Sequence, residues 1–355
     1  MSAELLTRTE GAAGVLSLNR PRAIHALTLE MVRAMTEALL AWRDDPAVHL
    51  VLIDHAVDPG GAPKLSRGFC SGGDITLLRH SALEDGGEEG RRFFFEEYRL
   101  NHLLFTYPKP VIAFMDGITM GGGVGISQPA RLRVATQNTR FAMPESGIGL
   151  FPDVGGGWYL SRLQGRLGQY LALTGARLDG AECLWAGLAT HYLPAASLPD
   201  AKARIIVGEA PAAVLQALAI TPPAPALAEH APDIARLFAS DTLEGIIAAL
   251  EQDCGAFAAQ TLTTIGTKSP TTCKVSLRQL AQSLTLPDFA ANMAMEYRIG
   301  SRVLMLPDFV EGVRAVIVEK DNAPAWSPAT PEAVSEAMLD AIFAALPASQ
   351  EWTPL

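Results

Sequence analysis

Apolar positions in the first 195 residues follow two spacings, one typical of strands and one typical of helices. Runs rich in apolar and β-branched residues predict strands at 14–21, 48–54, 109–117, 131–136 and 139–144. A helix is predicted over Thr28–Trp42, because apolar residues recur there at helical spacing and Thr28 is a good N-cap. Strands and helices therefore alternate, which favours a layered α/β fold.

The pattern changes near Leu193, where a segment rich in Ala and Pro begins. This composition predicts a connector with one short helix. Beyond it the apolar spacing is helical again. The predicted organisation is a core at 1–195, a connector at 196–235 and a C-terminal helical region at 236–355.

Start signals mark several helices in the C-terminal region. Ser269 is a capping residue followed by Pro270, a residue favoured at the first helical position. Asp288 is predicted to cap the next helix. Asp308 and Glu311 have the spacing of a capping box.

Composition narrows the class of protein. Of 355 residues, 49% are hydrophobic and 19% charged, so a large buried core is expected. A net charge of -10 without a basic run argues against a nucleic-acid surface. The N-terminus lacks signal-peptide features and no apolar run of about 18 residues occurs, so we expect no membrane association. The four cysteines form no CxxC pair and no HExxH occurs, which favours a cytoplasmic protein without a metal site.

Two glycine clusters, Gly68–Ile75 and Met115–Ser127, each follow a predicted strand and open a helical stretch. Backbone N–H groups at two such helix starts can form an oxyanion hole. The alternative is that the glycines serve tight turns or close packing. The dinucleotide, P-loop and nucleophile-elbow glycine fingerprints are absent from the sequence.

The segment RFAMPESGIGLFPDVGGG, residues 140–157, places Glu145 and Asp153 among glycines, prolines and apolar residues. One interpretation is that both are loop acids facing water. The other is that both are buried in a pocket, where burial and mutual repulsion favour the protonated form and suit a group that exchanges protons near neutral pH.

Several motifs, in this order and spacing, resemble the crotonase (enoyl-CoA hydratase/isomerase) superfamily. They are NRPRAIHAL, GFCSGGDI, YPKPVIAFMDGITMGGGVGIS and FAMPESGIGLFPDVGG. Within the superfamily, EEYRLN, FPDVGG and DFVEGVRAVIVEKDNAPAW are most similar to the 3-hydroxyisobutyryl-CoA hydrolase branch. The resemblance implies a spiral of ββα units with a C-terminal helical region, and hydrolysis of a short 3-hydroxyacyl-CoA thioester in valine breakdown.

The resemblance also implies roles for individual residues. The N–H groups of Gly73 and Gly122 correspond to the oxyanion hole, Glu145 to the catalytic carboxylate and Asp153 to the second acid. Glu97 matches a contact to the hydroxyacyl group. The segments that match the coenzyme A arm supply these further substrate-binding candidates: Arg22, Ala23, His25, Leu27, Cys70, Gly72, Asp74 and Ile75.

Some of these side chains have a second interpretation. His25 stands where many relatives have Asn, and a packing histidine is as good an account as a ligand contact. Cys70 has no histidine near it in sequence and is favoured as a buried small residue rather than a nucleophile. Arg22, Lys64 and Arg67 either meet coenzyme A phosphates or are solvated loop charges.

Gly125 departs from the hydratases, which typically carry a second glutamate at this position. Hydration of a C=C bond needs that acid–base group, so the hydrolase pattern is favoured over hydration or isomerisation. A non-catalytic acyl-CoA-binding protein is the alternative from another class. Whether Glu145 acts as base or nucleophile stays open at this level, as does homo-oligomer formation. Coenzyme A enters as part of the substrate, and no other cofactor is expected.

Overall fold

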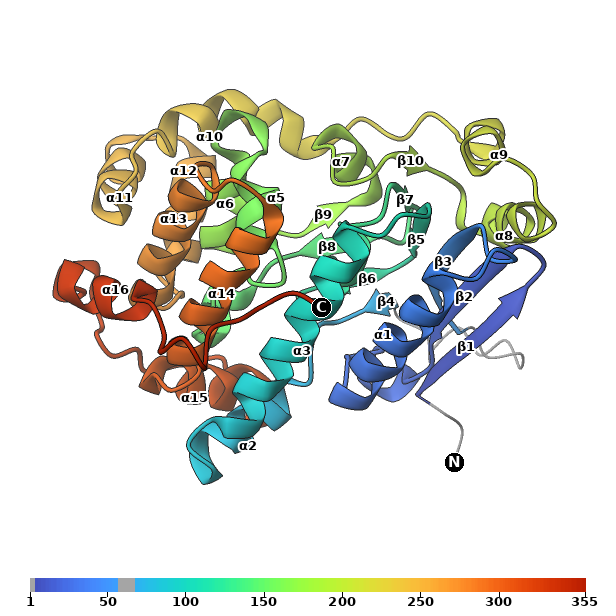
Figure 1. The fold of residues 1–355 in the computed structure, drawn as a ribbon. Helices are drawn as coiled ribbons and strands as arrows, with labels where there is room; N and C mark the ends of the chain where they lie inside the picture. Colours follow the sequence, from blue (N-terminus) through green and yellow to red (C-terminus); the bar gives the residue numbers. More distant parts are fainter. Residues whose placement is uncertain (1–3, 57–67) are drawn as a thin grey trace. The chain divides into compact units, whose positions relative to one another are not determined.

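A computed structural model describes residues 4–56 and 68–355. Contacts group the chain into two compact units, each drawn from separate stretches of sequence (Figure 1). The strand unit comprises Met1–Gly73, Leu100–Ala142 and Arg177–Ala228, and the helical unit comprises Asp74–Arg99, Met143–Ala176 and Glu229–Leu355. The boundaries expected at 195 and 235 do not coincide with these ends, and stay a prediction.

The larger sheet of the strand unit has six strands among the described residues, in the order β1-β2-β3-β5-β7-β10. The strands are β1 (Leu5–Glu10), β2 (Ala13–Leu18), β3 (Leu50–His55), β5 (Val111–Met115), β7 (Leu132–Ala135) and β10 (His191–Tyr192). Only β1 and β2 pair antiparallel; the other neighbours are parallel. The predicted strands at 14–21, 48–54, 109–117 and 131–136 are thereby confirmed as β2, β3, β5 and β7.

The smaller sheet has the order β4-β6-β8-β9 in the described part of the chain. Its strands are β4 (Gly68–Cys70), β6 (Ile118–Met120), β8 (Arg140–Ala142) and β9 (Leu178–Asp179). From β3 to β8 the strands alternate between the two sheets. This alternation, with α4 (Gly122–Ser127) after β6, is the expected spiral of ββα units, and β8 confirms the strand predicted at 139–144.

Helices cover the larger sheet. The predicted helix after Thr28 is α1 (Leu29–Arg43), and the Thr28 side chain accepts a hydrogen bond from the Met31 N–H. The Ala- and Pro-rich segment contains α8 (Leu198–Ile206) and α9 (Pro211–Leu218) rather than one short helix, so that prediction is wrong. The apolar residues of α8 and α9 form one buried cluster with the sheet residues Ala13, Val15, Leu50, Leu52, Ile112, Phe114 and Val134.

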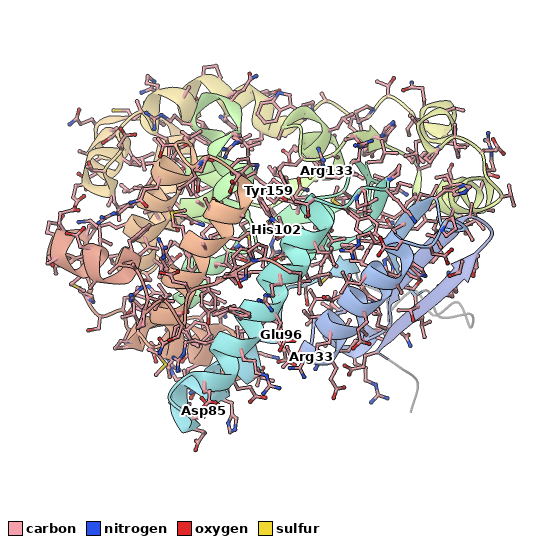
Figure 2. All side chains as sticks on the ribbon, viewed as in Figure 1. Arg33, Asp85, Glu96, His102, Arg133 and Tyr159 are labelled. Carbon is pink, nitrogen blue, oxygen red and sulfur yellow. The ribbon has the colours of Figure 1, made fainter. Side chains whose placement is uncertain are left out.

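The helical unit contains the remaining long helices. They are α2 (Ile75–Glu84), most of α3 (Glu88–Phe105), α5 (Gly156–Ser161), α6 (Leu167–Thr174), α10 (Ala231–Leu237), α11 (Leu243–Gln252), α12 (Ala256–Ile265), α13 (Pro270–Ser283), α14 (Phe289–Val303), α15 (Pro307–Val313) and α16 (Glu336–Phe343). Side-chain caps set several starts: Ser269 caps α13, Asp288 caps α14, and Asp85 accepts from the first N–H groups of α3 (Figure 2). None of the helices in the described ranges combines the length and apolarity needed to cross a bilayer.

The capping box predicted at Asp308 and Glu311 is wrong. The N-cap of α15 is Leu306, and the Asp308 carboxylate instead accepts hydrogen bonds from Ser269 Oγ (2.5 Å) and the Ser327 N–H (2.7 Å). Glu311 pairs with Arg314 at 2.8 Å. Both carboxylates thus bind partners other than the main-chain N–H groups at the start of α15, to which their spacing had assigned them.

Candidate active site

The two glycine clusters meet at one edge of the smaller sheet. Strands β4 and β6 are parallel neighbours, so their carboxyl ends lie on the same side. A Cβ atom added to Gly72 would lie 3.9 Å from the Gly122 nitrogen and 3.8 Å from the Met120 oxygen. The strand unit therefore brings the segments of Gly73 and Gly122, the predicted oxyanion donors, side by side.

Gly122 is the first residue of α4, where a backbone N–H has no partner within the helix. Gly123, the next residue, allows the start of α4 to approach the first glycine segment closely. A Cβ on Gly123 would lie 2.4 Å from the Cys70 carbonyl oxygen, so glycine is required there. Cys70 itself is buried, and its thiol donates to the Gly72 oxygen at 3.6 Å.

The loop predicted to hold the coenzyme A arm is hydrogen-bonded to the first glycine segment. The Leu27 N–H donates to the Gly72 oxygen (2.8 Å), and the Ser71 N–H donates to the Ile24 oxygen (2.9 Å). Arg22 is exposed, whereas Leu27 is fully buried. The predicted candidates of this part of the site are thus held together within the strand unit, and Ala23 lies half-buried between them.

The side chain of His25 packs on the inner side of this loop. Ile24 and His25 both have positive φ angles, 48° and 56°, which side-chain-bearing residues adopt rarely. The His25 ring is fully buried, accepts the Arg20 N–H at Nδ1 (3.0 Å) and lies 5.3 Å from the ring of His55. Burial, followed by His55, lowers the pKa of His25 to about 4. The ring is therefore neutral and keeps its acceptor, which agrees with the packing interpretation.

The helical unit contains a cluster of buried carboxyls. Asp153 is 4% exposed, and its Oδ2 accepts a hydrogen bond from the Tyr98 hydroxyl at 2.8 Å. Burial raises the pKa of Asp153 to about 7, while the Tyr98 hydrogen bond opposes the rise. Burial also holds the pKa of Tyr98 well above its usual range, so Tyr98 is a neutral donor.

Glu145 begins a 3₁₀ turn, Glu145–Ile148, and is 5% exposed. Its Oε2 has no hydrogen-bond partner among the described residues. Burial raises the pKa of Glu145 well above its usual range, and the charge of Asp153 raises it further. The interpretation of Glu145 and Asp153 as water-facing loop acids is therefore wrong.

Glu97, on α3, is the third buried acid of the cluster at 2% exposure. Burial and then Asp153 raise its pKa well above the usual range. Because the three carboxyls share one buried region, they do not all ionise near neutral pH.

The remaining candidates are Asp74 and Ile75, which follow Gly73 directly in the sequence. Asp74 caps α2 by accepting from the Leu77 N–H, and Ile75 is the first residue of that helix. Both belong to the helical unit, whereas Gly72 and Gly73 belong to the strand unit. Lys64 and Arg67 lie outside the described residues.

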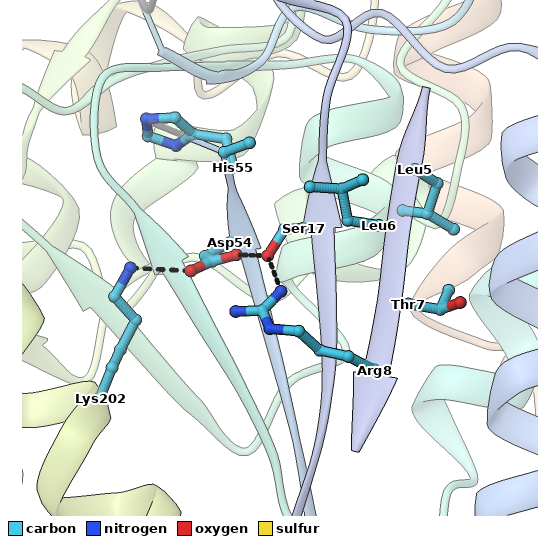
Figure 3. A pocket seen from close by; sticks show the side chains of 9 residues that line it. Leu5, Leu6, Thr7, Arg8, Ser17, Asp54, His55 and Lys202 are labelled. Atoms are coloured by element: carbon cyan, nitrogen blue, oxygen red, sulfur yellow. Dashed lines mark hydrogen bonds and ion pairs between the residues drawn. The ribbon is translucent and has the colours of Figure 1, made fainter. Parts of the chain in front are cut away.

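A cavity of about 700 Å³ lies in the strand unit beside β1, β2 and β3 (Figure 3). Four of its polar side chains are paired with one another: Lys202 with Asp54 (2.7 Å), Ser17 with Asp54 (2.5 Å) and Arg8 with Ser17 (2.8 Å). None of the residues lining it was a candidate. We therefore do not assign the thioester site to this cavity.

Sequence analysis missed two residues of the helical unit that contact the acid region. Tyr98 follows Glu97 directly in the EEYRLN motif, but the motif did not indicate that Tyr98 would bind Asp153. Glu296 accepts from the main chain just after Asp153. No local pattern in the sequence indicates either role, because both contacts join residues far apart in the chain.

Comparison with known proteins agrees with this arrangement. The family model described as enoyl-CoA hydratase/isomerase matches residues 13–343. The chain belongs to this family. A relative from Xenopus tropicalis named 3-hydroxyisobutyryl-CoA hydrolase, mitochondrial, is 42% identical over 97% of this chain and 89% of its own length. The human protein of that name is 41% identical over 98% and 90%.

Solved structures of the enoyl-CoA hydratase/isomerase family have the same fold. A carnitinyl-CoA dehydratase from Mycobacterium thermoresistibile has a TM-score of 0.92, with 41% identity and 99% coverage of both chains. An enoyl-CoA hydratase from Rhodobacter sphaeroides 2.4.1 has a TM-score of 0.90, with 36% identity, 99% coverage of this chain and 100% of its own. The crotonase-like fold class is thereby confirmed, whereas the names of these relatives differ: hydrolase, dehydratase and hydratase.

Proposed function

We propose that this chain hydrolyses a short 3-hydroxyacyl-CoA thioester, with 3-hydroxyisobutyryl-CoA as substrate and 3-hydroxyisobutyrate and coenzyme A as products. The observation that carries the proposal is the buried cluster of Glu97, Glu145 and Asp153, in which burial raises the pKa of all three carboxyls. Neighbouring carboxyls with raised pKa values can serve as proton acceptor and proton donor in one site. The curated relatives named as hydrolases support this substrate.

In the proposed reaction the thioester oxygen accepts hydrogen bonds from the N–H groups of Gly73 and Gly122. These donors are fixed in the backbone, so they stabilise the negative charge that develops on the oxygen without reorganising. Glu145 then acts by one of two routes. It either removes a proton from the attacking water, or attacks the acyl carbon to form a transient anhydride that water cleaves.

Both routes balance in the same way. In each, the C–S bond breaks, one water molecule is consumed, the acyl group leaves as the product carboxylate, and the coenzyme A sulfur takes up a proton from the acid cluster. Asp153 orients the water or the substrate hydroxyl, and Glu97 binds the 3-hydroxyl group. A single turnover in ¹⁸O water separates the routes, because the direct route places ¹⁸O in the first product, whereas anhydride cleavage at the Glu145 carbonyl places it in the enzyme.

Hydration or isomerisation of an enoyl-CoA is the second candidate, favoured by the names of the solved structures. Gly125, buried in α4, argues against it because it supplies no acid–base group. An acyl-CoA-binding protein without activity is the third candidate. Glu145 and Asp153 are both present, which argues against a protein that binds the ester without catalysis.

Purified protein is expected to release free thiol from 3-hydroxyisobutyryl-CoA and to leave the double-bond absorbance of crotonyl-CoA unchanged. Both signals are followed in parallel assays with the same enzyme stock. Loss of the crotonyl signal without thiol release would establish a hydratase and overturn the proposal. Binding of both esters without reaction would establish the binding protein.

Gly122→Pro is expected to lower kcat for thiol release by about 10²–10³-fold, the usual effect of losing one oxyanion donor. Proline removes the N–H yet suits the first position of a helix, so α4 is retained. Gly122→Ala is the matched control, since it adds a side chain but keeps the N–H. A less than tenfold difference between the two variants would place the oxyanion hole elsewhere.

The proposal needs no partner beyond the acyl-CoA substrate and no further cofactor. A cytoplasmic location is part of the proposal, although the curated relatives are named as mitochondrial proteins. A homo-oligomer is compatible with it, and gel filtration measures that state directly.

A further inference from the structure

The main chain that follows Asp153 has an unfavourable conformation. Val154 has a φ of 53° and Gly155 a φ of 90°. A β-branched residue in the left-handed region is strained, and such strain persists where the surroundings hold the backbone in place. The structure must therefore supply contacts that fix this turn.

Those contacts come from a carboxylate on α14. Glu296 is fully buried, and accepts the Gly155 N–H at 2.7 Å on Oε2 and the Gly157 N–H at 2.9 Å on Oε1. Asn292 Nδ2 (2.8 Å) and Gln279 Nε2 (3.0 Å) also donate to Oε1. Gln279 Nε2 donates in addition to the Pro152 oxygen at 2.7 Å, just before Asp153.

The turn lies directly against this network and leaves no room for a different arrangement. A Cβ on Gly157 would lie 2.6 Å from Ser283 Oγ, 2.8 Å from Gln279 Nε2 and 3.0 Å from Glu296 Oε1. A Cβ on Gly155 would lie 2.8 Å from the Phe289 ring. Glycine at both positions thus allows main-chain N–H groups to reach the carboxylate.

Both oxygens of Glu296 are occupied by donors from the protein, so this acid is unsuited to exchange protons with a substrate. We propose that Glu296 is the positioning residue of the Asp153 turn, holding the main chain on its C-terminal side so that the Asp153 carboxyl meets the Tyr98 hydroxyl. This inference rests on the proposed function, in which Asp153 orients water or the substrate hydroxyl.

Asp153 and Glu296 are linked by charge as well as by geometry. Burial raises the pKa of Glu296 to about 8, the Gly155, Asn292 and Gly157 donors lower it, and Asp153 raises it. The groups that face Asp153 are Glu97 and Tyr98 from α3, Glu145 from the 3₁₀ turn and Glu296 from α14. Losing the Glu296 contacts therefore raises the pKa of Asp153, because the turn no longer holds its carboxyl against the Tyr98 hydroxyl, the donor that lowers this pKa.

Glu296→Gln tests the role, since the amide has the same shape but presents an NH₂ group to a site made of N–H donors. We expect kcat for thiol release to fall about 10–100-fold with KM changed less than threefold. We also expect the acidic limb of the pH–rate profile to move to higher pH. Glu351→Gln is the control: Glu351 binds Arg298 on the same helix at 2.9 Å, so its loss weakens α14 without reaching the turn.

Asn292→Ala provides a second variant if Glu296→Gln does not fold. It removes one of the four donors to Glu296 and is expected to cause a smaller loss of kcat with the same direction of change in the pH profile. An unchanged kcat and pH profile in folded Glu296→Gln or Asn292→Ala, together with a lower Tm, would show a merely structural role and overturn the inference.

The titration of Asp153 can be read without activity, by ¹³C NMR of carboxyl-labelled aspartate with Asp153→Asn for assignment. A midpoint near pH 7 that moves higher in Glu296→Gln supports the inference even if wild type releases no thiol, in which case the proposed function alone fails. An unchanged midpoint in Glu296→Gln overturns the inference whether or not wild type is active.

Discussion

Glu145→Gln is expected to lower the rate of thiol release by about 10³–10⁴-fold while leaving the Kd for coenzyme A esters nearly unchanged. Either proposed route places the Glu145 carboxylate on the reacting atoms, and an amide is neither a base nor a nucleophile of comparable strength. The side chain is buried and its Oε2 lacks a partner among the described residues, so the amide fits without breaking a hydrogen bond at that atom. Thiol release and calorimetric binding of the ester measure the two quantities.

Glu96→Gln is the matched control for Glu145→Gln. Glu96 lies beside Glu97 on α3 but its side chain is 26% exposed and pairs with Arg92 (Figure 2). Its replacement is expected to change the rate less than threefold. Activity above one tenth of wild type in Glu145→Gln would show that another group carries the reaction.

Asp153→Asn is expected to lower the rate by about 10²–10⁴-fold and, at the same time, to stabilise the fold at pH 8. The pKa of Asp153 is about 7 in the folded protein, against a usual value of 3.8 for an aspartate side chain. Folding therefore takes up a proton between pH about 4 and 7, and the free energy of unfolding falls as pH rises through this interval. At pH 8 the buried charge costs up to about 4 kcal/mol, and asparagine removes it.

This figure already includes the Tyr98 hydrogen bond, because that bond is one of the causes that set the pKa of Asp153. Urea midpoints of wild type and Asp153→Asn, compared at pH 8 and at pH 4, measure the difference. The advantage of the variant should disappear at pH 4, where the wild-type carboxyl is already neutral. A variant less stable than wild type at pH 8 would contradict a raised pKa for Asp153.

Local signals in the sequence predicted much of the fold. Thr28, Ser269 and Asp288 cap their helices as expected, because an N-cap depends on N–H groups within three residues of it. One short helix was predicted where α8 and α9 lie, because Pro199 and Pro211 suggested interruption. Both prolines stand in the first turn of a helix, where the missing N–H costs nothing.

The candidate site, like the fold, was only partly predictable from the sequence. Burial of Glu145 and Asp153 followed from their apolar neighbours in the sequence, and the structure confirms it. The partners of these acids did not follow. Tyr98 is 55 residues from Asp153, and Glu296 is 141 residues from Gly155, so their contacts depend on tertiary packing rather than on spacing along the chain.

That separation in sequence sets an order of events during synthesis. The ribosome completes Gly155 141 residues before Glu296, which at about 5–20 residues per second is a delay of roughly 7–28 s. Throughout this interval the nascent chain carries Asp153 on a turn whose main-chain N–H groups have not yet met their carboxylate. A polypeptide released before α14 therefore contains Glu97, Glu145 and Asp153 but lacks the group that arranges the last of them.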